Sequence, residues 1–191
     1  MPTAEKGSDL IFLPRENKGF AREVARRSGN PFSVCYTCLT CTCACPFVHA
    51  MDHPPVSILR MTLLGREAEV LNSNTIWLCV GCNSCAEACP QGVDTPAVMD
   101  ALRQMALERG IAVPEPQVLA FHREVLSSIE SYGRTHKLAV MAGYKIKTRD
   151  FFTDADVGLK MFLKGKLDLL PSKVEDVESI RRIFRKHGMD K

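Results

Sequence analysis

The residues best suited to chemistry are nine cysteines, which all fall into two short runs and eight of which share a repeated spacing. Residues 35–46 read CYTCLTCTCACP and residues 79–90 read CVGCNSCAEACP, so both runs follow the spacing C-x2-C-x2-C-x3-C-P. Two residues between thiolates allow a short loop to turn three sulfurs toward one point, which suits three corners of a cubane iron–sulfur cluster. The duplicated spacing therefore predicts two 4Fe–4S clusters.

The fourth ligand of each cluster has to come from outside its own loop. In runs of this type the cysteine before proline ligates the other cluster, because the chain has already turned away. The first cluster is then predicted to take Cys35, Cys38, Cys41 and Cys89. The second is predicted to take Cys79, Cys82, Cys85 and Cys45. Because each run would supply the fourth ligand of the other run's cluster, the two loops are expected to form one structural unit.

Zinc and disulfides are the alternative uses of these cysteines. Structural zinc sites use two C-x2-C pairs each, and two triple runs that both end in C-P fit that pattern poorly. The N-terminus is charged before Arg15 and has no long apolar segment, so no secretory leader is expected. The cytoplasm is then the expected compartment, where cysteines stay reduced and favour metal binding over disulfides.

Cys43 lies inside the first run and is not needed by the ligand count. One interpretation is a small buried hydrophobic residue beside the cluster. The other is a reactive thiol or a substitute ligand for Cys41 or Cys45. The sequence leaves both open.

The composition excludes several other functions. The 191 residues are 46% hydrophobic and 25% charged, which is typical of a globular protein. A net charge of +3 is too small to indicate nucleic-acid binding, and no apolar stretch is long enough to span a membrane. The sequence contains no G-x-G-x-x-G, Walker A or G-x-S-x-G motif, so no catalytic residue is assigned. Two fully ligated clusters are suited to passing single electrons.

The elements that position the cysteines are predicted to be helices, giving an all-α fold. We expect three regions: an N-terminal arm and helix (1–30), a di-cluster domain (31–110) and a helical C-terminal extension for partner docking (111–191). Apolar periodicity with proline, glycine and capping signals predicts the individual helices. They cover 18–28, a segment from Pro55 to a stop at Gly65, 96–109 with Thr95 as N-cap, 116–132, 153–164 and 174–187. Residues 164–171, KGKLDLLP, are either a solvated face or a docking edge.

The cysteine runs and their surroundings resemble the C subunit of heterodisulfide reductase and its relatives in bacterial electron-bifurcating and sulfur-metabolism complexes. CYTCLTCTCACP is similar to that family's CYxCGTCTxxCP, and residues 57–94 are similar to its inter-motif helices and second motif. GYKIKTRDFF and LKGKLDLLP near the C-terminus also look like the family. Two departures are Leu39, where the family commonly has glycine, and the extra Cys43.

The resemblance implies an alpha-helical ferredoxin domain that acts as an electron wire. Its partners would be a flavin-containing A subunit and a B subunit whose cysteine-rich CCG motifs act on a disulfide, thiol or sulfur substrate, in an obligate hetero-oligomer. The chain has no Cys-Cys pair, so it does not resemble the B subunit. The alternative is the iron–sulfur subunit of a flavin-dependent succinate, fumarate or glycolate dehydrogenase. The succinate type adds a 2Fe–2S domain, whereas residues 1–34 contain no cysteine.

Overall fold

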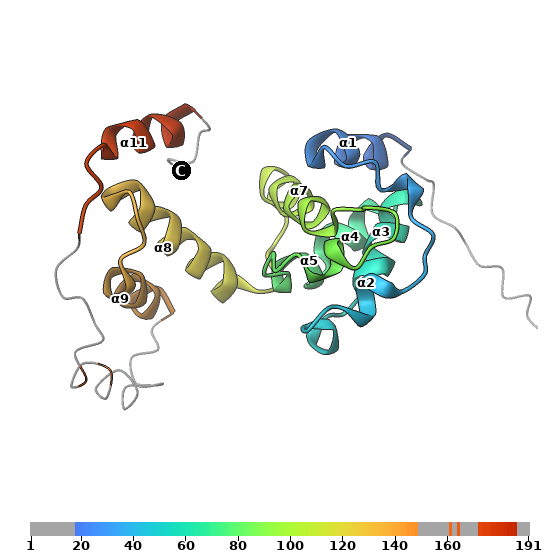
Figure 1. The fold of residues 1–191 in the computed structure, drawn as a ribbon, viewed down its shortest axis with the longest axis horizontal. Helices are drawn as coiled ribbons and strands as arrows, with labels where there is room; N and C mark the ends of the chain where they lie inside the picture. Colours follow the sequence, from blue (N-terminus) through green and yellow to red (C-terminus); the bar gives the residue numbers. More distant parts are fainter. Residues whose placement is uncertain (1–17, 149–160, 162–163, 165–171, 187–191) are drawn as a thin grey trace, which may run out of the picture. The chain divides into compact units, whose positions relative to one another are not determined.

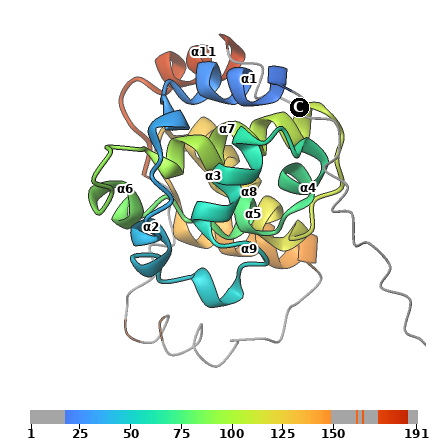
Figure 2. The same cartoon turned by 90° about the vertical axis from the view of Figure 1, so that its right-hand side faces the viewer.

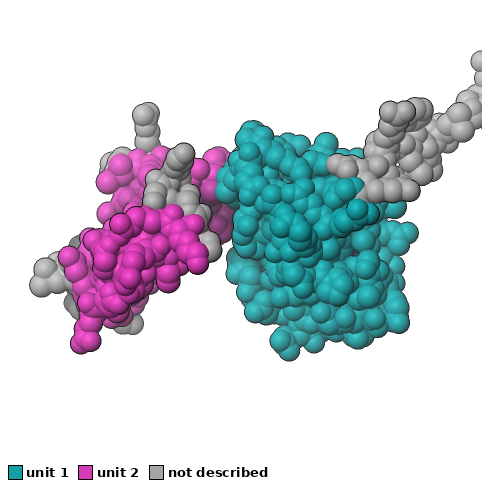
Figure 3. Space-filling model, turned by 90° about the horizontal axis from the view of Figure 1, so that it is seen from above, with its two compact units in different colours: residues 1–114 teal, residues 115–191 magenta. Residues whose placement is uncertain are grey.

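The computed structural model describes residues 18–148, 161, 164 and 172–186, and the regular elements in these ranges are all helices (Figure 1). The all-α prediction is therefore confirmed. The chain forms two compact units, residues 1–114 and 115–191 (Figure 3). The helix expected over 153–164 and the 164–171 segment lie outside the described residues, apart from Met161 and Lys164.

The first unit contains nine helical elements in the part of the chain that the structure describes. They are α1 (Lys18–Ser28), η1 (Phe32–Val34), α2 (Thr40–Cys43), η2 (Val48–Ala50), α3 (Pro55–Leu63), α4 (Glu67–Asn72), α5 (Thr75–Leu78), α6 (Ser84–Glu87) and α7 (Thr95–Glu108). Helix α7 packs against α1, α3, α4, α5 and α6, whose arrangement Figures 1 and 2 show. Val98, Leu102 and Met105 on its apolar face are completely buried. This packing gives both cysteine loops a common rigid support.

The start of α7 differs from the sequence prediction. Thr95 was expected to be the N-cap, but the cap is Asp94, whose carboxylate accepts a hydrogen bond of 3.0 Å from the backbone N–H of Ala97. A carboxylate suits this position because it satisfies a free N–H and also meets the positive end of the helix dipole. Thr95 is instead the first residue of the helix, and its hydroxyl is not used for capping.

The second unit is built around α8 (Pro116–Tyr132), which packs against α9 (Lys137–Thr148) and α11 (Val177–Lys186). Helix α9 was not predicted, and α11 begins three residues after the predicted start at 174. Ser128 of α8 accepts a 2.8 Å hydrogen bond from the backbone N–H of His136 and so fixes the start of α9. The units divide the chain after Pro114 and group α1 with the cysteine loops, whereas the sequence analysis divided it at 30 and 110.

Gly133 is the C-cap of α8, and we expect its replacement by alanine to destabilise the second unit by about 1–3 kcal/mol. Its φ of +77° favours glycine, and an added Cβ would lie 2.9 Å from the Cβ of Val174. Denaturant unfolding measures the loss. Gly110→Ala is the matched control, because Gly110 has a φ of +64° but open space around its Cα. Equal losses at the two positions would show that the Val174 contact adds nothing.

Candidate cluster-binding site

The two cysteine runs follow the same backbone path. Helices α2 and α6 begin at equivalent positions of the repeat, each directly after a residue in the left-handed region. These residues are Leu39, with φ +66°, and Asn83, with φ +62°. The two short helices also pack against each other (Figure 2). The sequence repeat is therefore a structural repeat, and its two halves meet.

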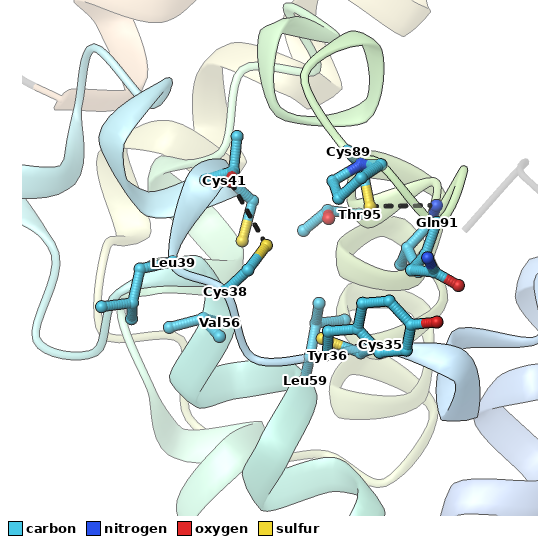
Figure 4. Close-up of a pocket in the computed structure, with 13 residues that line it drawn as sticks. Cys35, Tyr36, Cys38, Leu39, Cys41, Val56, Leu59, Cys89, Gln91 and Thr95 are labelled. Atoms are coloured by element: carbon cyan, nitrogen blue, oxygen red, sulfur yellow. Dashed lines mark hydrogen bonds between the residues drawn. The ribbon is translucent and has the colours of Figure 1, made fainter.

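The first cavity is lined by three cysteines of the first run and one of the second. They are Cys35, Cys38, Cys41 and Cys89. The sulfurs of Cys38, Cys41 and Cys89 face a common space (Figure 4). That space is partly open to solvent. Val56 and Leu59 of α3 supply part of its apolar wall.

The second cavity is lined by three cysteines of the second run and one of the first. They are Cys45, Cys79, Cys82 and Cys85. Pro96 and Met99 of α7 form part of its wall. In both cavities the chain thus brings together three cysteines from one run and the pre-proline cysteine of the other. Cys43 lines neither cavity and is exposed.

The spacing of these side chains does not suit a single metal ion. Among the described residues, no three cysteine, histidine, aspartate or glutamate side chains lie close enough together to hold one ion. A zinc ion bound at about 2.3 Å from each sulfur draws its four ligands closely together. Four cysteines that line one cavity without converging on a single ion fit a multi-iron cluster better.

Burial and hydrogen bonding divide the thiols into two kinds. Burial raises the pKa of Cys41 and raises that of Cys85 to about 11, with a further contribution from the neighbouring Cys79 thiol in the second case. At the exposed Cys38 and Cys82, hydrogen bonding to the Thr40 and Ser84 hydroxyls lowers the pKa instead. Buried thiolates require a compensating positive charge, which iron supplies when it binds and displaces the protons.

Several donors already point at the cysteine sulfurs. The backbone N–H of Thr37 donates to Cys35 Sγ at 3.4 Å, and that of Val93 donates to Cys89 Sγ at 3.3 Å. Backbone donors of this kind stabilise thiolates and orient metal ligands.

Two buried hydroxyls close to the cysteines have no hydrogen-bond partner within the described ranges. They belong to Thr42, which follows Cys41, and to Thr95, which lines both cavities. Buried polar groups are nearly always hydrogen-bonded in folded proteins. The Thr95 hydroxyl, at the wall of both cavities, fits a bound group that offers sulfur acceptors, as a 4Fe–4S cluster does.

A positive charge lies beside the second cavity. The guanidinium of Arg103, with a side chain only 15% exposed, donates a 3.1 Å hydrogen bond to the carbonyl oxygen of Cys79. Burial raises the pKa of the Cys79 thiol, whereas the backbone N–H of Gly81 and the charge of Arg103 lower it. The same side chain thus fixes the start of the second run and favours negative charge there. Sequence reasoning did not identify it, because it lies 24 residues away.

The link between the two runs depends on Asp52, which the sequence analysis also missed. Its carboxylate accepts hydrogen bonds from the hydroxyls of Ser73 (2.6 Å) and Thr75 (2.8 Å) and from the backbone N–H of Asn74 (3.0 Å). Partial burial alone would raise the pKa of Asp52, but these donors outweigh it and lower the pKa to about 2. The interaction holds the segment after the first run against the start of α5, which leads into the second run.

Replacing Asp52 with asparagine should lower the stability at pH 7 by about 1 kcal/mol, a value reduced because the residue is exposed on its outer side. The folded-state pKa lies below the unfolded value, so this stabilisation is complete above about pH 4 and is lost as the pH falls toward 2. Unfolding of wild type and variant across that range measures the difference. Asp100→Asn, which changes an exposed carboxylate paired with Arg103, should change little. A pH-independent loss in Asp52→Asn would contradict this account.

The rims of both cavities carry exposed apolar side chains. Tyr36 is 71% exposed and Leu39 is 54% exposed beside the first cavity, and Val80 is 61% exposed beside the second. Cys38 and Cys82 are exposed at the same rims. Each cavity therefore has one edge close to the protein surface.

Known proteins match this chain over its cysteine region and beyond. The family described as "4Fe-4S dicluster domain" matches residues 31–93. The iron–sulfur C2 subunit of the CoB–CoM heterodisulfide reductase of Methanocaldococcus jannaschii is 27% identical over 190 residues, which cover 95% of this chain and 92% of that protein. The C subunit of the ferredoxin:CoB–CoM heterodisulfide reductase of Methanosarcina acetivorans is 35% identical over 155 residues, covering 81% of this chain and 57% of that protein.

A third relative is the C2 subunit of the H2/formate:CoB–CoM heterodisulfide,ferredoxin reductase of Methanococcus maripaludis, which is 29% identical over 66% of this chain and 73% of that protein. In the described part of the chain, no helix combines the length and apolar character needed to cross a membrane. The dicluster match accounts for both cysteine runs, and the similarity to the M. jannaschii protein extends over nearly the whole sequence. The chain is accordingly similar to heterodisulfide reductase C subunits over nearly its whole length, and its dicluster domain makes it an electron-transfer protein with two 4Fe–4S clusters.

Proposed function

We propose that each cavity holds one cluster through the four cysteines that line it. Cys35, Cys38, Cys41 and Cys89 would ligate the first. Cys79, Cys82, Cys85 and Cys45 would ligate the second. The observation that carries this proposal is the position of the two cysteines that precede proline. Cys45 of the first run lines the second cavity, and Cys89 of the second run lines the first cavity. When bound, the clusters supply one-electron redox centres, and four thiolates for each leave no iron open to a substrate.

We propose further that the chain relays single electrons between a flavin-containing A subunit and a CCG-domain B subunit that acts on a disulfide, thiol or sulfur substrate. The relatives are named as C subunits of heterodisulfide reductases, which supports a place in such a complex. The exposed apolar rims support contact with other subunits at the edges where electrons enter and leave. We place the complex in the cytoplasm, where cysteines stay reduced.

The direct test is the content of iron, acid-labile sulfide and zinc in anaerobically purified protein, followed by EPR during stepwise reduction. The proposal predicts about eight iron and eight sulfide per chain and the broadened signal of two interacting reduced clusters. Cys43→Ser is the matched control, since Cys43 lies in the first run but lines neither cavity, and it should retain the full iron content. Stoichiometric zinc without an EPR signal would overturn the proposal.

A further inference from the structure

The beginning of α7 lies between the two cavities, and Thr95 lines both of them. This residue is 1% exposed, and its hydroxyl has no hydrogen-bond partner among the residues that the structure describes. The helix itself makes no use of that hydroxyl, because Asp94 caps α7 and the backbone N–H of Thr95 donates to the carbonyl of Val93 at 3.0 Å. A buried hydroxyl that the fold does not need is thus placed at the junction of the two sites.

The surroundings indicate which site the hydroxyl serves. Thr95 interacts with the thiol of Cys85, the buried cysteine of the second cavity, although the geometry falls short of a complete hydrogen bond. Pro96 and Met99, the next residues of α7 that line a cavity, also belong to the second one. The positive end of the α7 dipole acts on both sites, whereas a hydroxyl has one proton and can donate to one acceptor.

We propose that the Thr95 hydroxyl donates a hydrogen bond to a sulfur of the second cluster, either Cys85 Sγ or an inorganic sulfide next to it, and thereby raises the reduction potential of that cluster. A reduced cluster carries one more negative charge than the oxidised cluster. A hydrogen-bond donor therefore stabilises the reduced form more, and its removal shifts the potential to more negative values. Thr95 acts here as a positioning and tuning residue that makes the two clusters unequal.

This inference rests on the proposed ligand sets, so the test measures cluster content and potential separately. Thr95→Val keeps the shape and removes the hydroxyl, and Thr95→Ser keeps the hydroxyl. Thr62→Val is the control for the same substitution at a buried threonine, because the Thr62 hydroxyl already donates to the carbonyl of Ile58 at 2.7 Å and lines neither cavity. Iron analysis and EPR-monitored redox titration are performed on each full-length holoprotein, and the signals are assigned by comparison with Cys45→Ser.

The expected result is a negative shift of the second cluster's midpoint potential in Thr95→Val, a much smaller shift of the first, and wild-type values in Thr95→Ser and Thr62→Val. Unchanged potentials in a Thr95→Val protein with full iron content would overturn the inference and leave the cluster assignment intact. Wild-type protein without clusters would instead overturn the proposed function.

Cluster assembly gives a second readout if the valine variant loses iron. Loss of the second cluster alone in Thr95→Val and Thr95→Ala, with retention in Thr95→Ser, would support a hydrogen bond that the cluster requires. Loss of iron in Thr95→Ser as well would mean that the site needs the packing of the threonine methyl group, and the inference would be wrong.

Discussion

Replacing Cys45 with serine should damage the second cluster, although Cys45 lies in the first cysteine run. Replacing Cys89 with serine should damage the first cluster, although Cys89 lies in the second run. The reason is geometric, because Cys45 lines the cavity of Cys79, Cys82 and Cys85, whereas Cys89 lines the other one. Loss of one thiolate exposes one iron corner, so the iron content should fall and the EPR signal of a single cluster should change.

The comparison can be made without an independent assignment of the two signals. Cys45→Ser should match Cys82→Ser in its EPR spectrum, and Cys89→Ser should match Cys38→Ser. Cys43→Ser, two residues from Cys45, should match the wild type. If Cys45→Ser matched Cys38→Ser instead, each run would hold its own cluster with its own four cysteines, and the exchanged arrangement would be wrong.

Features set by local sequence could be predicted most accurately. Helix α8 was predicted with both of its ends, because Pro116 suits the first turn and Gly133 adopts the left-handed C-cap. The grouping of cysteines in the two cavities also follows the spacing of the runs. These signals act over a few residues, or through a repeat that is visible in the sequence itself.

Features that depend on distant contacts could not be predicted in this way. The bonds from Asp52 to Ser73 and Thr75 span 21 and 23 residues, and nothing near Asp52 in the sequence marks it. Thr95 was predicted as the N-cap because it precedes Pro96. The N-cap is Asp94 instead, and its negative charge is favoured at the positive end of the helix dipole. Only the fold shows that the Thr95 hydroxyl lies between two cavities instead of capping the helix.

Leu39 stands where the resembling family commonly has glycine, and the structure shows that the backbone at this position favours glycine. Leu39 has a φ of +66°, where glycine is favoured, and its counterpart in the second run is Asn83, a residue type that tolerates this region well. Thr37 and Gly81 form a second equivalent pair with positive φ. The first loop thus holds Thr37 and Leu39 in the left-handed region of backbone conformation, at a cost in folding free energy on the order of 1–2 kcal/mol each. The second loop has Gly81 and Asn83 at these positions, and both residue types adopt this conformation more readily.

Replacing Cys82 or Cys38 with serine should reduce electron delivery through the assembled complex to the rate seen without this protein. Each substitution removes a proposed ligand from the exposed edge of one cavity, and a relay of two centres in series fails when either centre is lost. Flavin reduction in the proposed A subunit should continue at its normal rate, because that step precedes the relay. The measurement compares flavin reduction with turnover of the final substrate in the same preparation.

Assembly has to be separated from electron transfer for this result to be informative. Cys43→Ser is again the matched variant, since Cys43 is exposed in the same loop and should support full turnover. Co-purification with the partner subunits shows whether Cys38→Ser and Cys82→Ser still dock, as we expect from the packing of α7 against its neighbouring helices. Normal turnover in a docked variant that lacks one cluster would mean that electrons reach the substrate by another route, and the relay would have to be abandoned for this chain.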